Sequence, residues 1–169
     1  MKHPIKNSLL GVITLIFIAC EKNDDTVAEL PNPSITKILP LGASRVEGAR
    51  PEYESFRYEL WRDLKENNIA FDFIGTQRDR ASYPAFNGES FDADHEGRGG
   101  WTSAQILSGI NEWLGETGSP DIILFSSPGG NDLLEDMDYN RTISNIEAII
   151  DALQANNSNV TILLEQLAL

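Results

Sequence analysis

Apolar residues occur in two patterns along this chain: short continuous runs, which are typical of buried strands, and a spacing of three and four residues, which is typical of amphipathic helices. Short apolar runs predict four strands, at residues 35–41, 69–75, 121–126 and 160–164. Apolar residues spaced three and four apart predict helices at 53–68, from 102 to before Pro120, and from 143 to about 156. This alternation predicts an α/β fold, a three-layer α/β/α arrangement around a parallel sheet with right-handed crossovers.

The segment 76–100 carries neither period and is predicted to be a loop. Loops of this length in compact domains usually serve a function or are disordered. Directly after it, the residues from Thr102 to Gln105 have the form of a capping box, which predicts the start of the next helix. The end of this long loop is therefore one place to look for a site.

The composition is that of one globular domain with an acidic surface. The chain has 169 residues, of which 41% are hydrophobic and 23% charged, enough for a core of ordinary size. Its 13 basic and 26 acidic residues give a net charge of −13. Such a surface repels phosphate backbones, so we expect no nucleic-acid partner.

The first residues have the composition of an export signal. Lys2 and Lys6 precede an almost wholly apolar stretch, 8–19, that is too short to span a bilayer. Cys20, the only cysteine of the chain, follows it directly, so no internal disulfide is expected. A small residue followed by cysteine resembles the processing site of bacterial lipoproteins, with Cys20 as the lipidated residue. An ordinary signal peptide with an incidental cysteine is the alternative.

The residues after Cys20 are predicted to be a flexible tether, because they offer little apolar surface to bury. The acidic run 21–25 resembles the surface-export tags of some Gram-negative lipoproteins. We therefore expect a signal peptide at 1–19, a lipoprotein tether at 20–34 and one folded domain at 35–169. The expected location is the bacterial cell envelope, with the outer-membrane surface favoured by the acidic run and a lipid anchor at Cys20.

A serine stands where the first predicted strand ends. The apolar run stops at Gly42, Ser44 follows two residues later, and Gly48 comes shortly before the first helical pattern. A serine at this place projects its hydroxyl at the carboxyl edge of a parallel sheet, where open α/β folds keep their sites. An ordinary strand-to-helix turn with a small polar residue is the alternative.

Two glycine-containing segments are predicted to reach the same edge of the sheet. Gly99 and Gly100 come just before the helix that starts at Thr102, where bare backbone N–H groups suit a developing negative charge. After the third strand, the glycines of 129–130 allow a sharp turn that aims the amide of Asn131 into the same crevice. A nucleophile and two kinds of oxyanion donor at one edge are what acyl transfer requires.

These three blocks resemble those of the SGNH hydrolases, the GDSL-type esterases and lipases. Gly42-Ala43-Ser44 stands where that family has Gly-Asp-Ser, the stretch 94–102 resembles its glycine block, and 129–132 (Gly-Gly-Asn-Asp) matches its Gly-x-Asn-Asp block. The stretches 58–61 and 94–97 resemble a branch that includes carbohydrate esterases. The resemblance covers the chain from about Ile35 to the C-terminus.

The resemblance implies the strand order 2-1-3-4-5 and a serine esterase mechanism without a cofactor. Ser44 would be the nucleophile. The Ser44 N–H, the Gly100 N–H and the Asn131 side chain would form the oxyanion hole. The implied substrates are small-molecule or carbohydrate esters with acetyl or other short acyl groups.

The chain departs from the family pattern in three places. Ala43 replaces an aspartate that helps hold the serine turn, and Ser127 and Pro128 stand where apolar strand residues are usual. The family's catalytic histidine lies in an Asp-x-x-His block near its C-terminus, after the last predicted strand, and no such block is found there in this sequence. His95 stands in the position of a family loop histidine rather than of the general base. We therefore expect a domain without its last strand and helix and with impaired activity.

Three other interpretations remain open at this point. The first is a non-catalytic surface lipoprotein that keeps the fold and a carbohydrate-binding crevice. The second is a flavodoxin-like nucleotide binder, disfavoured because no Gly-x-Gly-x-x-Gly follows the first strand and no P-loop lysine is found. The third is a calcium site made by Asp92, Asp94 and Glu96, which lacks a full ligand set at loop spacing.

Overall fold

The computed structural model describes residues 35–165. The predicted signal peptide, the predicted tether and Cys20 lie outside the described residues, as do 166–169. Helices and strands alternate along the described part, in the order β1 (Thr36–Gly42), α1 (Ser44–Glu47), α2 (Arg57–Glu66), β2 (Phe71–Phe73), β3 (Gln77–Arg78), β4 (Asp94–Gly97), α3 (Ser103–Thr117), β5 (Ile122–Ser126), α4 (Gly130–Leu134), α5 (Tyr139–Asn156) and β6 (Thr161–Leu164).

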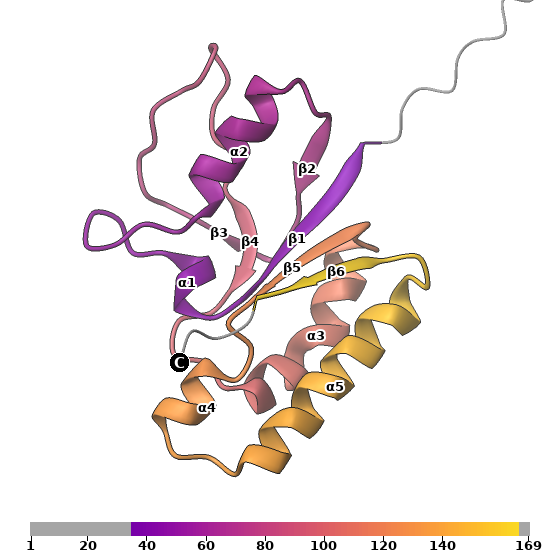
Figure 1. The fold of residues 1–169 in the computed structure, drawn as a ribbon. Helices are drawn as coiled ribbons and strands as arrows, with labels where there is room; N and C mark the ends of the chain where they lie inside the picture. The colour runs from indigo at the N-terminus through magenta and orange to yellow at the C-terminus, as the bar shows by residue number, and fades with distance from the viewer. Residues whose placement is uncertain (1–34, 166–169) are drawn as a thin grey trace, which may run out of the picture. The chain divides into compact units, whose positions relative to one another are not determined.

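The sheet is organised around β1, as Figure 1 shows. Along one edge, β1 pairs in parallel with β2 near its start and with β4 at its carboxyl end, where Gly42 lies opposite Gly97. Along its other edge it pairs in parallel with β5, which in turn pairs in parallel with β6. The short β3 joins β4 antiparallel. The four predicted strands thus take the order β2-β1-β5-β6, which confirms the expected order for the strands described.

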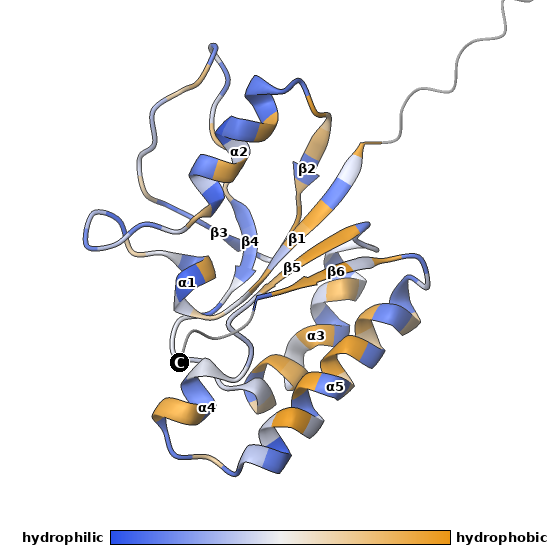
Figure 2. Cartoon of the chain, in the orientation of Figure 1, coloured by the Kyte–Doolittle hydropathy of each residue, from blue (hydrophilic) through white to orange (hydrophobic). Residues whose placement is uncertain are grey.

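Alternation along β1 divides the core between the two faces of the sheet. Leu39 and Leu41 face α3 and α5, whose apolar stripes cover that side (Figure 2). Ile38 faces a mainly aromatic cluster that contains Tyr58 and Trp61 of α2. Full burial of each such side chain is worth about 1.5–3 kcal/mol. The predicted three-layer α/β/α arrangement is confirmed.

The predicted and observed helix starts agree best at α3, where side chains cap the helix. The capping box at the start of α3 is present, because the Thr102 N–H donates to Gln105 Oε1 at 2.9 Å. The helix predicted at 53–68 is α2, and it begins at Arg57 rather than at 53, since residues 49–53 form a turn closed by an Ala49–Tyr53 bridge. None of the helices within residues 35–165 combines the length and the apolar character needed to cross a bilayer.

The prediction that all of 76–100 is loop is wrong, because β3 and β4 lie within it. The sequence of β4, Asp-His-Glu-Gly, has no apolar alternation that could reveal a strand. His95 and Glu96 are nevertheless buried there. Glu96 is held by hydrogen bonds from the N–H and hydroxyl of Thr76 and by an ion pair with Arg98. Polar partners contributed by distant residues therefore make a strand out of polar residues.

Candidate active site

Ser44 is the first residue of α1, directly beyond the carboxyl end of β1, and it is half-buried. The turn that carries it is tight. A Cβ on Gly42 would lie 2.7 Å from the Ser126 carbonyl oxygen and 2.9 Å from Val46 Cγ2, so this position accepts only glycine. The strand-to-helix turn expected for a nucleophilic serine is thus set by close backbone approach.

The glycine loop that follows β4 lies against this turn. The Arg98 N–H donates to the Gly42 carbonyl at 3.0 Å, and the Gly99 N–H donates to Glu47 Oε2 at 2.8 Å. A Cβ on Gly99 would lie 3.9 Å from Ser44 Cβ, which is van der Waals distance. Gly100 comes next, exposed and with a φ of +79° that favours glycine. The predicted nucleophile and the predicted glycine donor are therefore on neighbouring segments.

Arg98 holds the start of the glycine loop from the side. Its Nε donates to Glu96 Oε1 at 2.9 Å, and one of its Nη atoms donates to Thr76 Oγ1 at 3.0 Å. The guanidinium also lies over the rings of Trp101 and Trp113, 4.9 and 4.2 Å from their centroids. The loop is thereby fixed to β4 and to α3.

Asn131 lies in α4, which follows β5 at the same edge of the sheet. Its Nδ2 donates to the Trp101 carbonyl at 2.8 Å, one residue after Gly100. An amide nitrogen carries two hydrogens, so one N–H remains for another acceptor. The structure thus connects Ser44, the loop of Gly99 and Gly100, and Asn131 in one continuous set of contacts.

The residue after Asn131 was not assigned a role from the sequence, although it lies in the quoted Gly-Gly-Asn-Asp block. Asp132 is 2% exposed, and its carboxylate accepts from the Ser103 N–H at 2.7 Å, the Ser103 hydroxyl at 2.6 Å and the Thr142 hydroxyl at 3.2 Å. It therefore ties α4 to the start of α3 and to α5. Asp132 therefore also holds in place the short helix that carries Asn131.

His95 is the only histidine among residues 35–165, and its geometry does not suit a general base. It is 3% exposed, and its Nδ1 accepts the Gly97 N–H at 2.9 Å, which assigns the proton of the neutral ring to Nε2. Burial, followed by the charge of Arg57, lowers the pKa of His95 to about 3. The ring therefore stays neutral with its acceptor nitrogen occupied. This agrees with the expectation that His95 is not the base.

The three acidic residues considered for calcium each contact a different partner. Asp92 accepts the Phe73 N–H at 2.7 Å, Asp94 pairs with Arg78, and Glu96 pairs with Arg98. Burial raises the pKa of Asp92. Within residues 35–165, no three His, Cys, Asp or Glu side chains gather as metal ligands would. The geometry of the described residues therefore offers no support for the calcium interpretation.

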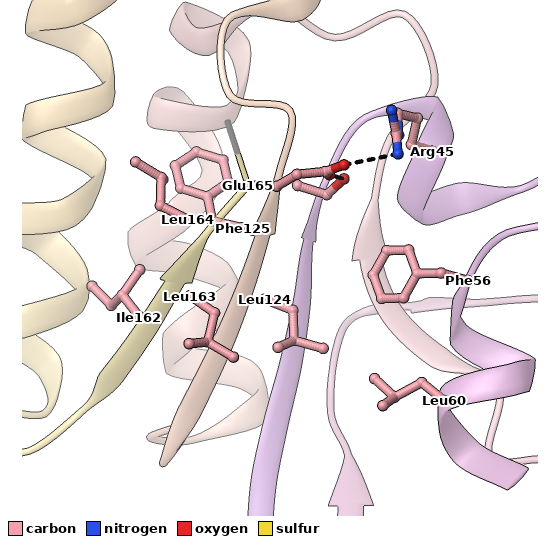
Figure 3. A pocket seen from close by; sticks show the side chains of 10 residues that line it. Arg45, Phe56, Leu60, Leu124, Phe125, Ile162, Leu163, Leu164 and Glu165 are labelled. Atoms are coloured by element: carbon pink, nitrogen blue, oxygen red, sulfur yellow. Dashed lines mark hydrogen bonds and ion pairs between the residues drawn. The ribbon is translucent and has the colours of Figure 1, made fainter. Parts of the chain in front are cut away.

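An apolar groove of about 490 Å³ lies on the α2 side of the sheet, beside β6 (Figure 3). Its apolar lining includes Phe56, Leu124 and Leu163. At its polar end, Arg45 forms an ion pair of 2.8 Å with Glu165, which also accepts a hydrogen bond from the Ser126 hydroxyl. Because Arg45 follows Ser44 directly, the groove ends next to the turn that carries the predicted nucleophile.

The sequence matches no protein-family model and no curated protein. The fold matches solved structures of esterases. A family 3 carbohydrate esterase of Clostridium thermocellum is 40% identical with a TM-score of 0.62, covering 75% of this chain and 59% of that one. A family 3 carbohydrate esterase from Talaromyces cellulolyticus is 26% identical with a TM-score of 0.65, covering 76% and 60%. The esterase AlinE4, of the SGNH-hydrolase family, is 24% identical with a TM-score of 0.56, covering 76% and 57%.

The chain therefore has the fold of the SGNH hydrolases, the GDSL-type esterases and lipases. Within that fold, its sequence and structure are similar to those of family 3 carbohydrate esterases. The chain spans about three fifths of the length of these two matched structures, 60% of one and 59% of the other.

Proposed function

We propose that this protein is a serine ester hydrolase that removes acetyl or other short acyl groups from carbohydrate. One observation carries the proposal: the Ser44 turn contacts the glycine loop, and the same loop is bound by the side chain of Asn131. The similarity to two family 3 carbohydrate esterases supports the substrate class.

In the proposed mechanism, Ser44 Oγ attacks the ester carbonyl carbon. The resulting oxyanion accepts hydrogen bonds from the Ser44 N–H, the Gly100 N–H and the second N–H of Asn131 Nδ2. The C–O bond to the alcohol then breaks, and the alcohol leaves with the proton that the Ser44 hydroxyl lost. Water attacks the acyl-enzyme, which releases the acid and restores the Ser44 hydroxyl. Donors that are held in place before the reaction cost no reorganisation, and the hydrogen bond from Asn131 to Trp101 holds one of them.

In this proposal Ser44 is the nucleophile and Gly100 and Asn131 are oxyanion donors, but His95 does not fit the role of the base. We therefore propose that residues 20–169 by themselves turn over esters only near the background rate. In a serine protease of another fold, loss of the catalytic histidine costs about 10⁶ in kcat and leaves roughly 10³ to 10⁴ over water. The same loss slows both the attack of Ser44 and the later attack of water, so we expect acylation of Ser44 to be seen with an activated ester, whose leaving group needs no proton.

The test is acylation of residues 20–169 with p-nitrophenyl acetate, followed by peptide mass mapping. We expect an acetyl group on the peptide that contains Ser44. It is absent in Ser44→Ala, and its rate of formation is little changed in His95→Ala. An acetylation pattern shared by the wild type and Ser44→Ala would refute the nucleophile. Rapid turnover abolished in His95→Ala would show that His95 is the base.

A second candidate function is a non-catalytic surface protein with a carbohydrate-binding crevice. Ala43 and the occupied Nδ1 of His95 favour it. Binding of an acetylated oligosaccharide, unaffected by Ser44→Ala and without acetylation of Ser44, would select this candidate. Release of acetate from that oligosaccharide would select the enzyme.

We also propose that the protein is exported and held at the cell envelope by a lipid on Cys20. The pattern of residues 1–20 and the acidic run 21–25 support this proposal.

A further inference from the structure

Arg57 is a buried arginine that the proposed mechanism does not use. It is the first residue of α2, and its side chain is 0% exposed. Three of its nitrogens donate to backbone carbonyls: Nε to Val46 at 2.7 Å, Nη2 to Glu47 at 2.9 Å and Nη1 to Ala93 at 3.2 Å. Nη2 also forms an ion pair of 2.9 Å with Asp79. Every branch of the guanidinium is therefore in use.

Two of these carbonyls belong to the last two residues of α1. This helix has four residues, Ser44–Glu47, and a helix this short leaves its last carbonyls without intrahelical partners and is unstable by itself. The planar guanidinium binds the carbonyls of Val46 and Glu47 together, and a positive charge at a helix C-terminus is favourable. The conformation of the Ser44 turn therefore depends on an arginine in another helix.

The same contacts extend to the glycine loop. Arg57 holds the carbonyl of Glu47, and the side chain of Glu47 accepts the N–H of Gly99 at 2.8 Å. Gly99 lies between the turn that carries Ser44 and the proposed donor Gly100. A shift of Glu47 would therefore move both sides of the site.

The carboxylate of Asp79 fixes the guanidinium from the opposite side. It accepts from the Tyr83 hydroxyl at 2.7 Å and from the Ala81 N–H at 2.8 Å. Burial would raise the pKa of Asp79, but these hydrogen bonds and the charge of Arg57 outweigh it and lower that pKa. Burial and the hydrogen bond to Asp79 raise the pKa of Tyr83 to about 12. Burial lowers the pKa of Arg57, against the charge of Asp79, but a guanidinium keeps its proton in proteins, so the pair stays ionised beside a protonated tyrosine.

We infer that Arg57 is a positioning residue, which holds Ser44 and the glycine loop at their working separation through α1 and Glu47. This inference rests on the proposed function for its consequence in catalysis. The arrangement of Arg57 itself is tested without any reaction.

The experiment is hydrogen exchange by mass spectrometry on residues 20–169, comparing the peptide of 43–48 with that of α3. In Arg57→Lys the positive charge remains, but the planar guanidinium that donates to several carbonyls is lost. Hydrogen exchange in 43–48 should then rise about tenfold or more, because hydrogen bonds to charged groups stabilise by about 1.5–3 kcal/mol each. Exchange in α3 stays as in the wild type. Arg57→Met gives a larger rise where it folds. The matched control is Arg62→Met, an arginine of the same helix that is 41% exposed and pairs with Glu59.

Two results would overturn the inference. Exchange that rises equally in 43–48 and in α3 would make Arg57 a general stabilising residue, and exchange unchanged in 43–48 would show that α1 does not depend on it. Acetylation of Ser44 is measured in parallel and should slow in Arg57→Lys but not in Arg62→Met. If the wild type forms no acetyl-Ser44, the proposed function fails while the exchange data still decide the role of Arg57.

Discussion

The side chain of Asn131 donates to the backbone carbonyl of Trp101 at 2.8 Å, across 30 positions of sequence. This hydrogen bond joins the segment after β5 to the segment after β4, and both lie beside the Ser44 turn at the end of β1. It positions an amide that has a second N–H to offer. The relationship between these two residues underlies the first prediction.

Asn131→Ala should slow acetylation of Ser44 by about 10² to 10³, the usual cost of removing one oxyanion donor. The measurement is the rate at which p-nitrophenyl acetate acetylates Ser44 in residues 20–169. Asn140→Ala is the control, because Asn140 lies on an exposed turn of α5. An equal rate in Asn131→Ala and the wild type would exclude Asn131 from the oxyanion hole.

Asp132→Ala should lower the free energy of unfolding by about 2–5 kcal/mol, because it leaves the buried N–H and hydroxyl of Ser103 without their acceptor. Urea unfolding followed by circular dichroism measures it. Asp151→Ala, at an exposed position of α5, should change the stability by less than about 0.5 kcal/mol. Comparable stability of the two variants would mean that Asp132 is not the anchor of α4.

The buried His95 predicts a pH dependence of stability. Its pKa is about 3 in the folded protein, whereas an unfolded histidine has a pKa near 6.5. Below the unfolded value, only the unfolded chain takes up the proton. Stability is therefore full above about pH 6.5 and falls as the pH drops toward the folded pKa, by up to about 1.4 kcal/mol per pH unit.

His95→Asn should remove this dependence between about pH 6.5 and pH 5, where most carboxylates remain ionised. The measurement is urea unfolding across that window, and residues 20–169 contain no other histidine to complicate it. An identical slope in the wild type and His95→Asn would show that the ring titrates normally and is not held neutral.

The β6 edge predicts self-association of residues 20–169. Among residues 35–165, β6 pairs only with β5, and Leu163 and Leu164 are 56% and 51% exposed. An apolar strand with free backbone groups is a template for another chain. Leu163→Lys should therefore shift the sedimentation profile toward monomer, whereas Ile143→Lys, on α5, should not. A monomeric wild type would contradict this prediction.

The proposed anchor predicts that the full chain, expressed in a Gram-negative host, fractionates with membranes. One acyl chain binds a membrane only marginally, but a multiply acylated cysteine holds a protein stably. Cys20→Ser should release the protein to the soluble fraction, while Ser8→Ala should not. Equal partitioning of the wild type and Cys20→Ser would remove Cys20 as the anchor.

The sequence by itself determined the parts of the protein that depend on neighbouring residues. The apolar run that became β1 is short and ends at a glycine, which favours a buried strand. The capping box of Thr102 and Gln105 satisfies a helix start with atoms three residues apart. The serine, glycine and asparagine blocks could be placed at one sheet edge, because the carboxyl ends of parallel strands meet there.

Only the tertiary structure decided where the buried polar residues belong. β4 reads as loop because its residues are polar, and it is a strand because Thr76 and Arg98 satisfy Glu96. From the sequence alone, Arg57 would be placed on the polar, solvent-facing side of an amphipathic helix. It is buried because carbonyls 10 and 11 residues earlier and 36 residues later converge on it. A buried polar group is tolerated only when it has hydrogen-bond or ionic partners. Here most of the partners are distant in the sequence, so the residues near Arg57 and Glu96 do not indicate them.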